Sequence, residues 1–259
     1  MNSLQEKFGF LEGKNSTHFA RTMMLSDISR LMDCAGRQDS YETYRDAVII
    51  ENVLSKPSQK SRKLAWRHLS RLYSLSSVHC LFRAFRLLYF SEDKGQNVLA
   101  FQLAYARDPL LRACAPFLLD LRIGQQITSQ GTEKMLAKLY PDRFTSASRK
   151  SFAQNINGTW TQAGFLRGKV TKTRVQPDVS WVNVAFALFM AFLQGYQAKM
   201  MLVSEWVRLL GLSEEEVLHF ASQAAQKGLM VYRRTGDVME FRFPGLLTNQ
   251  EHEWLHESN

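Results

Sequence analysis

Positive charge without matching negative charge is the feature of this 259-residue sequence that most directly indicates chemistry. Residues 52–91 contain eight Lys or Arg residues and no Asp or Glu. Like charges one turn apart destabilise a helix, so a solvated helix usually carries acids as well. The pattern predicts a polyanionic partner, either nucleic acid or an anionic membrane surface. The side chains expected to contact phosphates are Lys56, Lys60, Arg62, Lys63, Arg67 and Arg71, with Gln59 or His68 within reach of bases.

A second basic group follows in residues 141–175, where seven Lys or Arg residues face one acid, Asp142. Since the whole chain has a formal net charge of +9, these two groups lie on an otherwise acidic body. Gln154 and Asn155 could read adenine edges if their helix enters a major groove. The alternative for each group is an ordinary solvated face. The phosphate-contacting residues predicted here are Arg149, Lys150, Lys169, Lys172 and Arg174.

Catalytic and metal-binding patterns are weak in this sequence. It has no phosphate-binding Walker loop, no GxSxG, no HExxH and no dinucleotide fingerprint. His252 and His256 have the spacing to chelate a metal on a helix, but no third ligand accompanies them, and we expect an exposed tail. The three cysteines are widely spaced, which fits buried thiols in a reducing cytoplasm. We therefore predict a non-enzymatic protein with no catalytic residues, no metal site and no cofactor.

Helical periodicity dominates the N-terminal half. One helix is expected through Met24, Ile28, Leu31 and Met32, ending at Gly36. A second helix is expected over residues 40–54, and Pro57 marks the break before the basic helix, residues 58–74. A helix, a short turn and a basic helix form the outline of a helix-turn-helix. Two further helices are expected over residues 77–90 and 97–124, the second broken near Pro109 or Pro116.

The same outline recurs in the second basic group. A short helix is expected from about Thr132, and Thr145 or Ser146 can cap the next one, which runs to about residue 165. The basic stretch that follows, residues 167–178, favours extended structure because it is rich in Val and Thr. A basic strand or hairpin directly after a candidate recognition helix predicts the wing of a winged helix.

The C-terminal third repeats the outline once more. A helix ends at Gly211, Ser213 and Glu216 form a capping box for the next helix, and residues 229–244 alternate as a β-hairpin. The helix in the recognition position begins with three glutamates, so we expect this module to contact proteins or to pack on the rest of the chain. Two arginines at its wing keep a DNA role open: Arg233 and Arg234.

These patterns predict a mainly α protein, a helical bundle with helix-turn-helix and winged-helix modules and a few short β-hairpins. The predicted domains are residues 1–92, 93–195 and 196–259. The most apolar run, residues 181–193, is shorter than the roughly twenty residues that a membrane span needs. We expect it to be a buried core helix. The N-terminus lacks the apolar region of a signal peptide, so a cytoplasmic protein without membrane insertion is predicted.

Two stretches resemble the BrxA family of bacteriophage-exclusion (BREX) systems, small helical proteins encoded beside a methyltransferase, a large ATPase and a phosphatase-like protein. The first is "ENVLSKPS" with the following "SR", and the second is the helix containing Ser148, Arg149 and Lys150 that ends "AGFL". The resemblance spans roughly residues 20–195, and the C-terminal segment departs from the family. It implies a cytoplasmic defence component with helix-turn-helix features that binds DNA without a base specificity that we can name. The matching residues of the first stretch are Glu51, Asn52, Leu54, Lys56, Ser58, Ser61 and Arg62.

Together, the residues and the resemblance predict a component of a bacterial anti-phage defence system that binds double-stranded DNA, chiefly through phosphates, beside other defence-system proteins. One alternative is an assembly adaptor whose basic groups dock acidic partner proteins or RNA. A transcriptional regulator is the other alternative. Competition by unrelated duplex DNA separates the first two, because added duplex displaces a partner that is bound on a DNA-binding surface.

Overall fold

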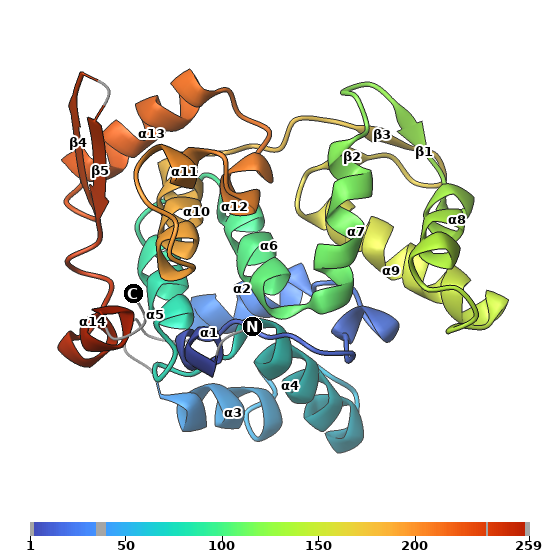
Figure 1. The fold of residues 1–259 in the computed structure, drawn as a ribbon. Helices are drawn as coiled ribbons and strands as arrows, with labels where there is room; N and C mark the ends of the chain where they lie inside the picture. Colours follow the sequence, from blue (N-terminus) through green and yellow to red (C-terminus); the bar gives the residue numbers. More distant parts are fainter. Residues whose placement is uncertain (1–2, 35–39, 237, 257–259) are drawn as a thin grey trace.

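The computed structural model describes residues 3–34, 40–236 and 238–256. The fold is mainly α, as predicted, with one three-stranded and one two-stranded antiparallel sheet among the described residues (Figure 1). The buried side chains form one cluster that runs from Phe8 to Leu246. This cluster crosses the residue numbers at which we predicted domain boundaries, and the three domains remain a prediction from sequence pattern.

The most apolar helix packs among other helices in the left half of Figure 1. It is α10 (Trp181–Leu193), whose side chains are buried except for the half-buried Phe192. A helix that is apolar all round is stable only when neighbours cover every face. The predicted core helix is therefore confirmed, and no helix within the described ranges is both long and apolar enough to span a bilayer. The helices that cover α10 are α5 (Cys80–Tyr89), α6 (Gln96–Arg107), α12 (Glu205–Arg208) and α13 (Glu214–Gln226).

A polar cluster ties α10 to the start of α6. The Asn183 side-chain amide donates to the carbonyl of Gly95 at 2.9 Å, and its Oδ1 accepts from the main-chain N–H of Ser180, also at 2.9 Å. The Ser180 hydroxyl donates to the carbonyl of Lys94 at 2.7 Å. These bonds satisfy polar groups that would be costly to bury alone. Gly95 occupies this crowded point with a left-handed φ of 87°.

Replacing Gly95 with alanine is expected to destabilise the fold, because the new Cβ would meet Asn183 Oδ1 and would lie 2.9 Å from Ser180 Oγ. Gly195→Ala is the matched control, since Gly195 has a similar φ of 84° but no atom within 4 Å of an added Cβ. Both variants place alanine at a positive φ, which destabilises each of them by a similar amount. Overpacking should make Gly95→Ala about 1–3 kcal/mol less stable than Gly195→Ala in urea unfolding. Equal stabilities would show that the cluster tolerates the methyl group.

The basic helix has the predicted bounds. It is α4 (Gln59–Tyr73), and Ser58 caps it in a capping box with Ser61. The helix before it, α3 (Tyr41–Ile49), ends earlier than predicted, because Asn52 adopts a left-handed φ of 56° and its side chain bonds the main chain of Lys56. Residues 50–58 separate the two helices, more than the three to four of a helix-turn-helix turn.

The first predicted helix is divided in two. Met24 has a left-handed φ of 55° and separates a short 3-10 helix from α2, and the predicted stop at Gly36 lies outside the described residues. The long segment after α5 breaks at Pro109, which begins α7, whereas Pro116 lies inside that helix. The remaining elements of this part are α1 (Ser3–Phe8), η1 (Thr17–Phe19), α2 (Leu25–Cys34) and α7 (Pro109–Leu119).

Residues 126–174 form a compact unit at the right of Figure 1. In its sheet, β3 lies between β1 and β2 and is antiparallel to both, with Gln126 opposite Thr173 and Leu166 opposite Arg174. Thr145, one of the two predicted caps, caps the longer helix, and the shorter helix begins before the predicted Thr132. The elements are β1 (Gln126–Ile127), α8 (Ser129–Leu139), α9 (Ser146–Gln162), β2 (Leu166–Arg167) and β3 (Lys172–Arg174).

The C-terminal part confirms the predicted capping box and hairpin. Ser213 and Glu216 cap α13 reciprocally. The strands pair from Val231 opposite Arg242 to Thr235 opposite Val238. Because α13 packs on α10, this segment contacts the rest of the chain, which was one of its two expected roles. Its remaining elements are α11 (Lys199–Leu202), β4 (Val231–Thr235), β5 (Val238–Arg242) and α14 (Asn249–His256).

Candidate nucleic-acid interface

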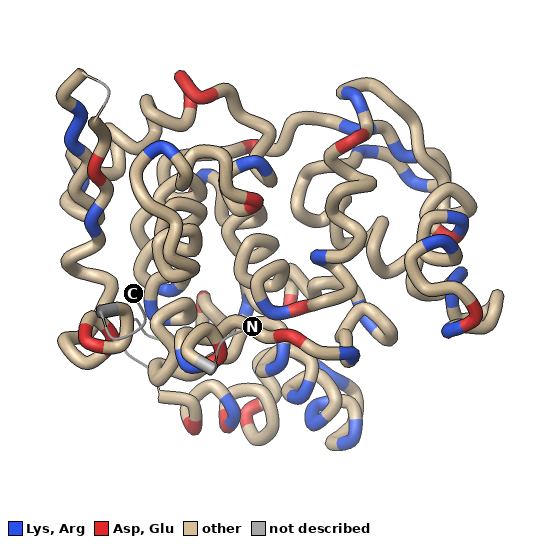
Figure 2. The backbone as a smooth tube through the Cα atoms, viewed as in Figure 1, with Lys and Arg blue, Asp and Glu red and all other residues tan. Residues whose placement is uncertain are grey.

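Lys and Arg positions gather along the backbone of α4 and of the unit of β1 to β3, as Figure 2 shows. On α4, the buried face is formed by Ala65, Trp66, Leu69, Leu72 and Tyr73. The cations occupy the opposite face, and Lys60, Lys63 and Arg67 are exposed. Since α4 carries no acid, its outer face presents positive charge alone.

Two cations of residues 52–91 form ion pairs with acids from distant parts of the same chain. Lys56 pairs with Asp27 of α2 at 2.8 Å, and Arg83 pairs with Glu251 of α14. Two cations of the basic group are therefore already neutralised. Lys56, a predicted phosphate contact, is held at the α2 side and is not part of the outer face of α4.

Two arginines of α4 also bond the chain itself. The Arg62 guanidinium donates to the carbonyls of Ile49 and Ile50, at the end of α3. Arg71 Nη2 donates to the carbonyl of Asn15 at 2.8 Å. A carbonyl bond leaves the positive charge of a guanidinium in place, so these side chains still contribute to the local field.

His68, predicted to lie within reach of bases, is buried beneath this surface. It lines an opening of about 470 Å³ together with Arg67 and Arg71. Burial lowers the pKa of His68, and the nearby Arg67 and Arg21 lower it further. His68 is therefore neutral at pH 7 and adds no charge to the surface.

The unit of β1 to β3 presents a groove between α9 and the β2–β3 loop. This groove, here called the α9 groove, has a volume of about 580 Å³. Gln154 and Gly158 of α9 form one wall, and Lys169 and Lys172 form the other. None of its lining residues is acidic. The full lining is Thr128, Ser129, Gln130, Gln154, Asn157, Gly158, Lys169, Val170 and Lys172.

The predicted contacts of this unit divide into accessible and internal ones. Lys150, Gln154 and Lys169 are exposed. Lys172 is half-buried and donates from Nζ to the carbonyl of Gly168 at 3.0 Å. Burial lowers the pKa of its amine. Lys150 and Lys169 are consequently the most accessible cations of the predicted set.

The other predicted residues of this unit bond the chain itself. Arg174 is buried, its guanidinium bonds the carbonyls of Phe165 and Val175, and it lies over the Phe165 ring. Arg149 donates to the carbonyl of Phe144, and Asn155 donates to the carbonyl of His18 at 3.0 Å. Trp160 and Phe165 are buried core residues. Arg174 therefore lies outside the accessible surface, and the half-buried Asn155 already uses its amide in a bond to the chain.

Residues 14 and 15 join the two basic regions. Arg71 of α4 donates to the carbonyl of Asn15, and Arg143, from the α8–α9 connection, donates to the carbonyl of Lys14 at 3.0 Å. The exposed Lys14 adds a further positive charge at this point. Arg143 is one of the seven cations of residues 141–175, but the sequence did not indicate where it would lie in the fold. Its position follows from contacts with a segment more than a hundred residues away, which no local signal indicates.

A buried network behind this surface joins η1 to the start of α7 and to α9. His18 Nδ1 lies 3.1 Å from Asp108 Oδ2, and His18 Nε2 lies 2.8 Å from Thr159 Oγ1. Burial alone would raise the pKa of Asp108, but His18, the Ser16 hydroxyl and the Leu111 N–H outweigh it and hold this pKa at about 2. An acid, an imidazole and a hydroxyl in line can serve nucleophilic catalysis. All three side chains are buried, so here they connect helices.

Sequence reasoning missed this network because His18, Asp108 and Thr159 are far apart along the chain.

The described part of the chain contains no group of three or more His, Cys, Asp or Glu side chains that could hold a metal ion. Neither protein-family models nor curated proteins match this chain.

Proposed function

We propose that this protein binds double-stranded DNA, chiefly through phosphates, with the unit of β1 to β3 as the main contact. The α9 groove is the observation that carries the proposal, because its polar and cationic walls contain no carboxylate. The helix itself, residues 146–162, also contains no Asp or Glu. An accessible helix flanked by lysines is suited to phosphate contacts along a duplex.

The order of the elements supports a winged helix. A helix (α7) is followed by β1, two packed helices, and the strands β2 and β3, with β3 in the middle of the sheet. In that arrangement α9 takes the recognition position and the β2–β3 loop is the wing. Lys150 and Gln154 would face the duplex, and Lys169 would contact a neighbouring phosphate.

The outer face of α4 extends this surface. The segment of residues 14 and 15 lies between Arg71 and Arg143, so a duplex held by the α9 groove could also reach the cations of α4. We further propose that the protein acts without catalysis in a bacterial anti-phage defence system, together with other proteins of that system. This part rests on the resemblance to the BrxA family in residues 51–62 and 148–150.

A salt series tests the proposal. Binding of a mixed-sequence duplex of about thirty base pairs should weaken with salt, with a slope of log affinity against log salt concentration of about −4.5 to −5.5, the value for about five to six neutralised phosphates. Fluorescence anisotropy measures the affinity, and unrelated duplex DNA should displace the labelled duplex. If binding is absent at low salt, or if an acidic polypeptide competes as well as DNA does, the adaptor alternative replaces this proposal.

A further inference from the structure

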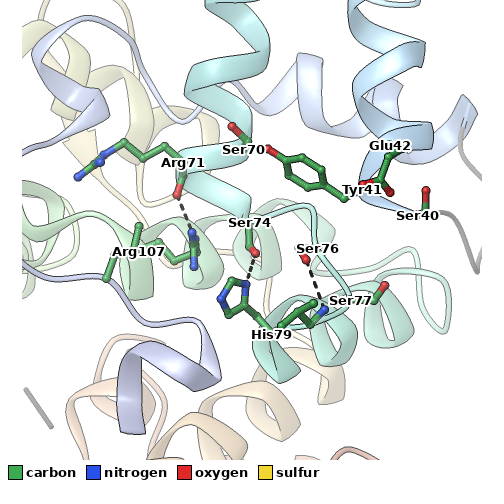
Figure 3. Close-up of a pocket in the computed structure, with 12 residues that line it drawn as sticks. Ser40, Tyr41, Glu42, Ser70, Arg71, Ser74, Ser76, Ser77, His79 and Arg107 are labelled. Atoms are coloured by element: carbon green, nitrogen blue, oxygen red, sulfur yellow. Dashed lines mark hydrogen bonds between the residues drawn. The ribbon is translucent and has the colours of Figure 1, made fainter. Parts of the chain in front are cut away.

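Another opening, separate from the α9 groove, lies where the ends of four helices meet (Figure 3). It has a volume of about 780 Å³ and receives residues from the start of α3, the end of α4, the α4–α5 connection and the end of α6. This volume is in the range of small-molecule sites. We call it the α4–α5 pocket; its lining is Leu11, Ser40, Tyr41, Glu42, Ser70, Arg71, Ser74, Ser76, Ser77, Val78, His79 and Arg107.

Arg107 is a buried cation in the wall of this pocket. Its guanidinium donates to the carbonyls of Arg71 and Gly9, and among the described residues it has no ion pair with an acid. Burial, with the nearby Arg71, lowers its pKa to about 9, so it is still charged at pH 7. A buried charge is costly when no opposite charge compensates it. An anionic ligand in the pocket would supply that compensation.

The α4–α5 connection adds groups that can bind an anion beside Arg107. Ser74 has a left-handed φ of 65°, which places its hydroxyl 2.6 Å from His79 Nδ1. Burial lowers the pKa of His79, as do the neighbouring Arg107 and Arg83, so the imidazole is neutral at pH 7. His79 precedes the ten-residue α5 without a side-chain cap. The N–H groups that begin this helix favour a negative group.

The opposite end of the pocket has different chemistry. Tyr41 is partly exposed there and is held edge-on against Trp66 at 5.0 Å between ring centroids. Glu42 is the one acid among the lining residues. Figure 3 shows Tyr41 and Glu42 across Ser74 and Ser76 from Arg107, while the Arg71 side chain extends away from them. An aromatic ring and a carboxylate can contact the ring, hydroxyl or amino groups of an organic moiety.

We propose that the α4–α5 pocket binds a small phosphate monoester. Its phosphate would lie between Arg107 and the start of α5, and its organic part would extend toward Tyr41 and Glu42. This site goes beyond DNA binding, because it is formed by different residues from those of the α9 groove.

Adenosine 5′-monophosphate, adenosine and inorganic phosphate are suitable probes for calorimetry on the full chain. The monophosphate is expected to bind at least about tenfold more tightly than either adenosine or phosphate, because it engages both ends of the pocket. Val78→Glu adds a carboxylate to the lining at a side chain that is 76% exposed, so the core is not disturbed. Val238→Glu, at a valine of β5 that is 72% exposed, is the matched control.

Val78→Glu should weaken binding of the monophosphate by about tenfold or more, and Val238→Glu should leave it unchanged. Three results would overturn the proposal. The first is no heat of binding with any probe up to about 10 mM. The second is equal affinity in Val78→Glu and the original protein. The third is loss of binding only after Lys150 and Lys169 are changed, which would place the nucleotide on the DNA surface.

Discussion

Changing Lys150 and Lys169 together to glutamate is expected to lower the affinity for duplex DNA by about a hundredfold or more at low salt. Both side chains are exposed: Lys150 lies on α9, and Lys169 lies in the wall of the α9 groove. Within the described ranges neither one makes an ion pair, so their charge is available to phosphates. Reversing these two charges replaces two attractions to phosphates with two repulsions, and it leaves the buried core unchanged.

The same double variant should also change the salt dependence. Two fewer phosphate contacts make the log–log slope shallower by about two. A general loss of positive charge could imitate part of this effect, so Arg208→Glu with Lys227→Glu serves as the control. These two cations are also exposed, and they lie on α12 and just after α13. If both double variants lost equal affinity, the α9 groove would not be the contact surface.

Replacing Asp108 with alanine is expected to lower the free energy of unfolding by about 3–5 kcal/mol, because several buried donors would lose their charged acceptor. The carboxylate accepts from the Ser16 hydroxyl, the Thr17 N–H and the Leu111 N–H, and it faces His18. Its removal leaves these donors buried without a partner and takes away the cap of α7. Urea unfolding followed by circular dichroism measures the change.

The contribution of Asp108 should also depend on pH. Its pKa of about 2 in the folded protein lies below the ordinary aspartate pKa of 3.8, so the unfolded chain binds more protons between these two pH values. Stability from this group is therefore complete above about pH 4 and is lost as pH falls toward 2. Asp108→Ala should flatten that part of the stability profile.

A matched control for Asp108→Ala is Asp178→Ala. Asp178 pairs with Lys94 at 3.3 Å, but both side chains are exposed. Exposed pairs contribute at most about 1 kcal/mol. A loss for Asp108→Ala as small as that of Asp178→Ala would mean that the buried network does not hold η1, α7 and α9 together.

Elements with local signals were predicted well. The bounds of α4 follow from Pro57, the Ser58–Ser61 box and the apolar spacing inside the helix. The Ser213–Glu216 box and the alternating strands of the C-terminal hairpin are equally local. Predictions failed where one residue left its expected conformation, as Asn52 does when its side chain bonds Lys56 and ends α3 early.

The sequence predicted which segments supply the cations of the candidate site, but only partly which of these cations are exposed. The sequence correctly located two cation-rich segments, but it did not separate the exposed Lys150 and Lys169 from the buried Arg174. Arg174 is internal because folding brings the carbonyl of Phe165 to its guanidinium. Likewise, the strand β1 has two residues and exists because β3, more than forty residues later, pairs with it.

The sequence by itself determined the mainly α fold, the buried apolar helix and the excess of positive charge, because caps, periodicity and net charge depend on neighbouring residues. The tertiary structure alone decided which cations stay accessible, where the two basic regions meet at residues 14 and 15, and how His18, Asp108 and Thr159 come together. It also placed Arg107 in the wall of a pocket. These outcomes depend on contacts between distant segments, and such contacts form only when the chain packs.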